Sequence, residues 1–268
     1  MDKMQTIAII GCGAIGEAVA GYLADHDNVD IAVAIVEPGM DSRARDVFGD
    51  NVEIAHSVDE VSTDIDLAVD CAGHPALRQH GEAVLSRGTN LISVSSGALA
   101  DAGLYERLAA AAKQGSAQLR VVSGAIGALD VLAAGSVGEL TSVTYRGRKP
   151  PKGWLGSPAE SKLDLDALSE ATVHFSGSAR NAALEYPKNA NVAASVALAG
   201  IGFDDTTVEL IADPDITRNV HEIVAEGGFG RFEFRIEGKS LPDNPRSSAI
   251  TAMSVTREIL NPGSPIVI

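Results

Sequence analysis

The stretch IIGCGAIGEAVAGYL, Ile9 to Leu23, places three glycines at the spacing G-x-G-x-x-G. The run before them, Thr6 to Ile10, is rich in β-branched side chains and is typical of a buried strand. After the glycines, Ile15, Val19 and Leu23 recur at helical spacing. In such a strand–turn–helix unit the first glycine permits the tight turn, the second leaves room for a pyrophosphate, and the third lets helix and strand approach. The stretch therefore predicts a dinucleotide-binding turn.

Strand-like and helix-like segments alternate through the first half of the chain. The further strand-like runs are residues 31–36, 52–55, 66–71, 90–95 and 119–123. This alternation predicts an α/β fold with an N-terminal, Rossmann-type, doubly wound parallel sheet. After about Gly127 the pattern changes, and segments such as residues 231–237 alternate apolar and polar side chains. That alternation is typical of a mixed sheet with one open face.

These patterns predict two domains. Residues 1–126 are expected to form the dinucleotide-binding domain, and a C-terminal helix at about 245–268 is expected to pack back on it. Residues 127–244 are expected to form a second, α+β domain that carries the mixed sheet and the substrate site.

Glu37 ends the second predicted strand, where an acidic side chain commonly binds the ribose hydroxyls of the adenosine. A carboxylate there repels a 2′-phosphate and favours NAD, whereas Arg43 and Arg45 just downstream leave NADP open. The other cofactor contacts are expected in the turn and after the fourth strand: Gly11, Gly13, Ala14, Ile15, Gly16, Cys71, Ala72 and Gly73.

Composition excludes several classes of protein. The net charge of −15 over 268 residues disfavours nucleic acid and anionic membranes as partners. The two cysteines, Cys12 and Cys71, argue against a disulfide scaffold and fit a reduced, cytoplasmic setting. No apolar run reaches the roughly 18 residues of a membrane span, and we expect no signal peptide. His and Cys lack the spacing of metal ligands, so no metal site is expected.

A nicotinamide cofactor transfers hydride, so the protein must supply a proton relay, for which histidine is the usual residue near neutral pH. Two of the six histidines are candidates. His74 follows the fourth predicted strand, near the edge at which nucleotides bind, and His221 lies on a predicted strand of the second domain. Spacing alone leaves both open.

Two segments are candidates for binding anions. Residues 146–152 are basic within an acidic chain and include Lys149; they predict either an anion pocket or a solvated loop. Lys188, Asn189 and Asn191 precede or begin a predicted small-residue helix at 191–201. Helix amides, carboxamides and a lysine suit a carboxylate or the nicotinamide amide, although an asparagine there also serves as a simple helix cap.

Together these segments resemble the L-aspartate dehydrogenase family over nearly the full chain. The segments that match best are Y-P-K-N-A-N-V-A (Tyr186 to Ala193) and N-V-H (Asn219 to His221). Further matching segments are residues 10–16, 70–74, 123–130, 145–150, 154–158, 177–180 and 212–214. The glycine motif at 10–16 is shared by many folds, so the two named segments carry the resemblance.

The resemblance implies NAD(P)-dependent oxidation of L-aspartate to iminoaspartate. That product hydrolyses to oxaloacetate and ammonia or feeds NAD biosynthesis. The resemblance further implies that His221 is the active-site histidine, that Ala125 and Asn191 contact the cofactor, and that the chain forms a homodimer through its second domain. Lys149, Lys188 and Asn189 are then the expected substrate-binding residues. Two alternatives stay open: another two-domain NAD-dependent dehydrogenase of a small acid or semialdehyde, and a non-catalytic NAD-binding sensor.

Overall fold

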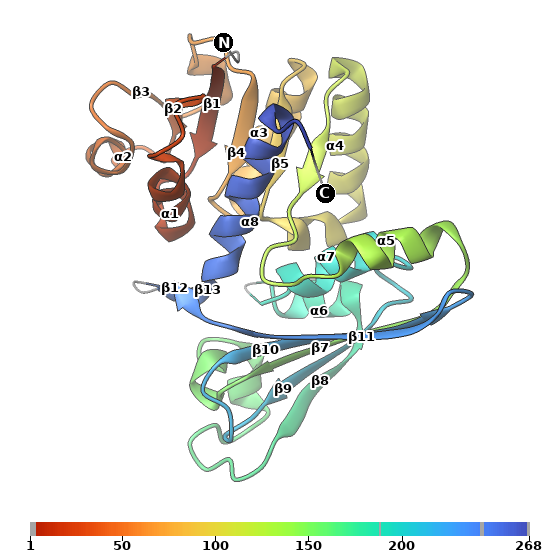
Figure 1. Cartoon of the computed structure of the whole chain (residues 1–268). Coiled ribbons are helices and arrows are strands. Elements are labelled where there is room, and N and C mark those ends of the chain that lie inside the picture. The colour runs from red at the N-terminus through yellow and green to blue at the C-terminus, as the bar shows by residue number, and fades with distance from the viewer. Residues whose placement is uncertain (1–3, 188, 242–243, 267–268) are drawn as a thin grey trace. The chain divides into compact units, whose positions relative to one another are not determined.

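The computed structural model places six parallel strands in the order β3-β2-β1-β4-β5-β6 (Figure 1). The strands are β1 (Gln5–Ile10), β2 (Val29–Ile35), β3 (Glu53–Ala55), β4 (Leu67–Asp70), β5 (Asn90–Ser93) and β6 (Leu119–Val121). The connecting helices are α1 (Ala14–Leu23), α2 (Asp41–Phe48), η1 (Val58–Glu60), α3 (His74–Ser86), η2 (Ser96–Ala100) and α4 (Ala102–Gly115). The predicted doubly wound parallel sheet is confirmed. Its order reverses between β1 and β4, which is where such sheets bind nucleotides.

The strands of this sheet are nearly continuous apolar runs because both of its faces are buried. Ile7, Ile9 and Val69 are fully buried, because helices cover both faces of a parallel sheet. The C-terminal helix α8 (Ala249–Leu260) adds Ala252, Val255 and Ile259 to the same core. Figure 1 shows α8 lying along the sheet, and the short helix η5 (Asn261–Gly263) follows it.

The second sheet is mixed and has the order β11-β10-β7-β9-β8. Only its β7–β9 pair is parallel. Its strands are β7 (Leu140–Lys149), β8 (Thr172–Ser178), β9 (Thr207–Ala212), β10 (Asn219–Gly227) and β11 (Gly230–Gly238). The helices of this unit are α5 (Leu129–Val137), η3 (Pro151–Trp154), η4 (Pro158–Ser161), α6 (Ala179–Glu185) and α7 (Asn191–Ala199), and a two-stranded sheet pairs β12 (Ser240–Leu241) with β13 (Asn244–Ser248).

The two faces of the second sheet carry different side chains. A Cβ added at Gly200, which ends α7, would lie 3.3 Å from Val143 of β7 and 3.4 Å from Leu132 of α5. The helices therefore cover the face of β7 that carries Val143 and, by the two-residue period of a strand, Tyr145, Gly147 and Lys149. Arg146 and the other even-numbered residues of β7 point to the opposite face.

Contact density divides the chain into two units, Met1–Val122 with Thr251–Ile268, and Ser123–Ile250. The structure describes residues 4–187, 189–241 and 244–266. Within those ranges, no helix combines the length and the apolar character that a membrane crossing needs. Sequence patterns did not predict α5 or α6. Helix α5 buries only Leu132 and includes a glycine, so it lacks a clear apolar stripe, and α6 has only seven residues.

Candidate active site

In the glycine turn after β1, two glycines leave no room for a side chain and one glycine does. Gly11 has φ +94°, and a Cβ there would lie 2.6 Å from Cβ of Ala72. A Cβ on Gly16 would lie 2.5 Å from the carbonyl oxygen of Gly11. Gly13, in contrast, has no atom within 4 Å of an added Cβ and immediately precedes α1. Gly11 and Gly16 therefore build the turn, and Gly13 leaves space for an anion before the helix N-terminus.

The loop after β4 lies against this turn, through the contact of Ala72 with Gly11. Gly73 has φ +96° and precedes α3, again with no atom within 4 Å of an added Cβ. The side chain of Cys71 lies in the hydrophobic core, and burial raises the pKa of its thiol. Only the backbone of Cys71 is therefore placed to contact a cofactor.

Asp70, which the sequence analysis did not select, holds this loop in place. Its carboxylate is fully buried at the end of β4, and its Oδ2 accepts hydrogen bonds from the hydroxyls of Ser93 (2.7 Å) and Ser95 (2.6 Å). Its Oδ1 accepts the backbone N–H of Ala72 at 3.0 Å. Burial raises the pKa of Asp70, and these hydrogen bonds oppose that rise. Asp70 thus joins β4, β5 and the Ala72–Gly73 loop. The only feature of the sequence that could have pointed to Asp70 is its position as a polar residue at the end of an apolar strand.

Glu37 follows β2 and is exposed to solvent. The two arginines downstream have other partners: Arg43 forms an ion pair with Glu17, and Arg45 donates to the backbone carbonyl of Asp50 at 3.1 Å. Exposed contacts of this kind contribute little free energy, so a bound phosphate can compete for them. The exposed carboxylate of Glu37 is compatible with a contact to the ribose hydroxyls.

His221 lies on β10, where its Nδ1 is 2.8 Å from the hydroxyl oxygen of Tyr145 on β7. Both side chains are buried, and their rings lie at an interplanar angle of 18°. Burial, and then the charge of Lys149, lower the pKa of His221 to about 4. The imidazole is therefore neutral at pH 7 in the free protein, with Nε2 as the ring nitrogen that Tyr145 does not contact.

Lys149 connects the histidine to a second predicted segment. Its Nζ donates to Oδ1 of Asn189 at 2.7 Å and lies 5.0 Å from the centre of the Trp154 ring. The structure therefore brings together Lys149, Asn189 and His221, three residues selected from the sequence. Lys188, the fourth candidate of this group, lies outside the described residues.

The basic run at 146–152 is not the solvated loop that was one of its two interpretations. Residues 146–149 belong to β7, and Arg146 and Arg148 pair with Glu209 (2.6 Å) and Asp213 (2.9 Å). Because side chains alternate along a strand, Lys149 alone of these three cations lies on the His221 face. Lys152, the fourth cation of the run, lies in η3 and is exposed. Among the cations of β7, Lys149 is therefore the candidate for the anion pocket.

The helix-cap interpretation of the asparagines is wrong, because the N-cap of α7 is Ala190 and it makes no side-chain cap hydrogen bond. Asn191 is the first residue of α7 and is half-buried. Ala125 is half-buried in the loop after β6, where the preceding Gly124 has φ +65°. His74, the rival histidine, begins α3 in the first unit, whereas Lys149 and Asn189 belong to the second.

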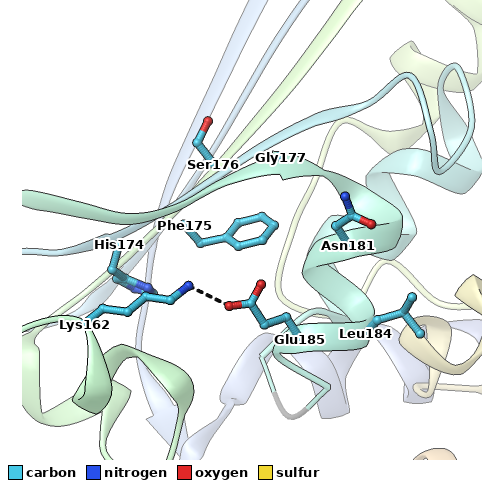
Figure 2. A pocket seen from close by; sticks show the side chains of 8 residues that line it. All are labelled: Lys162, His174, Phe175, Ser176, Gly177, Asn181, Leu184 and Glu185. Carbon is cyan, nitrogen blue, oxygen red and sulfur yellow. Dashed lines mark hydrogen bonds and ion pairs between the residues drawn. The ribbon is translucent and has the colours of Figure 1, made fainter.

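A second histidine–tyrosine pair lies in the same unit as His221. Nδ1 of His174 is 3.1 Å from the hydroxyl of Tyr186, and the ring packs edge-to-face on Trp154. Burial, and then the charge of Lys162, lower the pKa of His174 to about 4. Figure 2 shows the open pocket beside it, where Lys162 and Glu185 form an ion pair of 2.6 Å. The pocket measures ≈ 700 Å³ and is lined by Lys162, His174, Phe175, Ser176, Gly177, Asn181, Leu184 and Glu185.

None of these pocket-lining residues was a candidate from the sequence. The described part of the chain also contains no group of three or more His, Cys, Asp and Glu side chains that could hold a metal ion.

Comparison with known proteins matches both parts of the chain. Residues 130–261 match the family model described as aspartate dehydrogenase, C-terminal, and residues 11–122 match the NAD-binding domain of homoserine dehydrogenase. The L-aspartate dehydrogenase of Ruegeria pomeroyi is 52% identical over 99% of this chain and 94% of its own. That of Pseudomonas aeruginosa is 45% identical over 96% of this chain and 97% of its own.

Solved structures agree with these matches. The aspartate dehydrogenase of Thermotoga maritima superposes with a TM-score of 0.77 at 28% identity and covers 98% of this chain and 99% of its own. A hyperthermophilic archaeal homoserine dehydrogenase in complex with NADPH has a TM-score of 0.60 at 13% identity, over 96% of this chain and 97% of its own. The second likeness is one of fold alone.

Proposed function

The chain belongs to the L-aspartate dehydrogenase family, and we propose which of its residues carry out the reaction. It is an NAD(P)-dependent oxidoreductase that oxidises L-aspartate. The observation that carries this conclusion is the 52% identity to a named L-aspartate dehydrogenase over 99% of the chain, because it spans the glycine turn and the His221 strand alike. Neither the rival dehydrogenase of another substrate nor the non-catalytic sensor is favoured.

The residues present fit a dinucleotide. Space at Gly13, a helix N-terminus and an exposed carboxylate at Glu37 match the needs of a pyrophosphate and a ribose. When bound, the nicotinamide supplies the acceptor for hydride. The residues proposed to hold the cofactor are Gly11, Gly13, Ala14, Ile15, Gly16, Glu37, Ala72, Gly73, Ala125, Asn191 and the backbone of Cys71.

Lys149 and Asn189 are proposed to bind the substrate, with Lys188 as a further cation. The ammonium group of Lys149 has three donors, of which one is directed to Asn189. A carboxylate of aspartate can accept from the same ammonium group and gain a charge-assisted hydrogen bond. Asn189 then acts both as a partner that holds Lys149 and as a carboxamide available to the substrate.

His221 is proposed to handle the proton of the reaction at Nε2. The α-ammonium must lose a proton before its nitrogen lone pair can form the C=N bond as hydride leaves Cα. A water molecule then adds to the imine and loses a proton in turn. A neutral His221 can accept either proton.

A pKa of about 4 makes His221 a weak base in the free protein, and the positive charge of Lys149 contributes to that value. A carboxylate bound beside Lys149 offsets its charge and raises the pKa of His221. The substrate thereby strengthens the base that acts on it. This coupling is a consequence of placing Lys149 and His221 on one face of the sheet.

The test is a steady-state assay with L-aspartate and either NAD or NADP, on the unmodified protein, on His221→Ala and on His74→Ala. We expect His221→Ala to lower kcat at least about tenfold with unchanged NAD binding. His74→Ala should retain most of its turnover. Loss of turnover in His74→Ala together with normal turnover in His221→Ala would reverse the assignment. Oxidation of other acids, but not of aspartate, would favour the rival dehydrogenase.

We further propose that the protein works in the cytoplasm as a homodimer, without nucleic acid or membrane as a partner. Two free, buried cysteines suit a reducing compartment, the charge of −15 disfavours polyanions, and the dimer follows from the family resemblance. Sedimentation equilibrium tests the dimer directly.

A further inference from the structure

Tyr145 reaches His221 because no side chain lies between them. His221 of β10 pairs with Gly147 of β7, two residues beyond Tyr145 on the same face. A Cβ on Gly147 would lie 2.7 Å from the hydroxyl oxygen of Tyr145 and 3.2 Å from Cζ of that ring. The phenol therefore extends along its own strand, over Gly147, to the neighbouring histidine.

The hydroxyl of Tyr145 stays protonated, because burial raises its pKa. A phenol oxygen can accept from Nδ1–H of the neutral imidazole and from Nδ1–H of the imidazolium. In the neutral ring held this way, the lone pair is on Nε2. It can therefore remain bonded to the ring in both protonation states. A carboxylate in its place would stabilise the imidazolium and raise the pKa of His221.

We propose that Tyr145 is a positioning residue for the reaction: its hydroxyl holds Nδ1 of His221 through both protonation states and leaves Nε2 as the nitrogen that exchanges protons with substrate. This inference rests on the proposed role of His221. It adds a function for Gly147, whose missing side chain is the gap through which the phenol reaches the ring.

The test replaces Tyr145 by Phe, which removes the hydroxyl and keeps the ring that packs in the core. The chain offers a matched control in Tyr186→Phe, which removes the hydroxyl from the other buried tyrosine–histidine pair. For each variant we would measure kcat, KM for L-aspartate, the Kd for NAD, and the ¹⁵N shifts of the labelled histidine rings against pH.

We expect Tyr145→Phe to lower kcat at least about tenfold, with KM and the NAD Kd within about twofold of the unmodified protein. Because a hydrogen bond to a charged group is stronger than one to a neutral group, the imidazolium loses more than the imidazole, and the pKa of His221 falls. Tyr186→Phe should leave the ¹⁵N shifts of His221 unchanged.

Gly147→Ala gives a second, independent perturbation, since its methyl group would displace the phenol. If the two residues act through one contact, the double variant Tyr145→Phe, Gly147→Ala should be little slower than the slower single variant, and the effects should not add. This comparison of rates stands even where one variant is less stable, provided that the folded fraction is measured.

Three results would overturn the role of Tyr145: a kcat within twofold in Tyr145→Phe, unchanged ¹⁵N shifts of His221 in that variant, or a large loss in Tyr145→Phe when His221→Ala keeps full turnover. A failure of the proposed function has another signature. The unmodified protein then fails to oxidise L-aspartate, although the ¹⁵N spectrum still reports the bond to Tyr145.

Discussion

At the scale of single residues, two buried histidines depend on their surroundings for the same reason. His174 and His221 are 7% and 6% exposed, and burial is the main cause of the low pKa of each. Each has a tyrosine hydroxyl at Nδ1 and neither has a carboxylate there. Both are therefore held neutral at pH 7, and the folded protein resists their protonation.

This arrangement predicts a loss of stability in acid. The pKa of each histidine is about 4 in the folded protein and about 6.5 when unfolded, so the unfolded chain binds more protons between these values. The stability present above pH 6.5 should be lost progressively as the pH falls towards 4, by up to roughly 3 kcal/mol for each histidine. Urea unfolding at pH 7.0, 5.5 and 4.5 measures it.

His221→Asn should reduce this pH dependence, and His26→Asn, at an exposed position, should leave it unchanged. An unaltered slope in His221→Asn would contradict the contribution assigned to this residue.

At the scale of the element, different glycines of the turn are expected to affect the stability of the protein and its affinity for NAD. Gly16→Ala places a methyl group against the carbonyl oxygen of Gly11, and we expect it to cost about 1–3 kcal/mol of the free energy of unfolding. Gly13→Ala meets no atom and has an ordinary negative φ, so its stability should change little. Its methyl group fills the space proposed for the pyrophosphate, and the Kd for NAD should rise at least about tenfold.

Thermal unfolding and NAD titration of both variants distinguish these effects. Gly39→Ala is a poor control because of its φ of +91°, whereas Gly21→Ala in α1 has open space and helical geometry. Normal NAD affinity in Gly13→Ala would place the pyrophosphate elsewhere.

At the scale of the whole molecule, the first unit is assembled from both ends of the chain. Its core contains Ala252, Val255 and Ile259 of α8 together with strands that precede Val122. The second unit is thus an insertion in the sequence of the first, so that folding of the nucleotide-binding unit requires residues far apart in the chain.

Removal of residues 251–268 should therefore abolish cooperative unfolding of the first unit and NAD binding with it. The reason is that three fully buried apolar side chains leave the core at once. Removal of residues 264–268 is the control, because residues 264–266 are exposed. Circular dichroism melts and NAD titration of the two truncations provide the measurement. Full NAD affinity without α8 would show that the strands and α1–α4 suffice.

Local patterns in the sequence were enough to predict the glycine turn and most of the strands and helices. The turn, the alternation of strands and helices, and the open alternation of β11 depend on side chains near each other in the chain, so periodicity detects them. Helices α5 and α6 were not predicted, because short segments with a glycine or few buried side chains show no clear periodicity of apolar residues. Family resemblance, rather than spacing, separated His221 from His74.

Only the tertiary structure decided which side chains meet. Tyr145 and His221 are 76 residues apart, and Lys149 and Asn189 are 40 apart. The two-residue period of a strand tells which face of the sheet a side chain lies on, but not which side chain lies next to it on the neighbouring strand. The order of the strands and their register determine that neighbour. The same register separates Lys149 from Arg146 and Arg148, and sets Gly147 opposite His221. The sequence by itself thus determined the fold class and the candidate residues, while the pairing of β7 with β10 decided the contacts that tune the histidine.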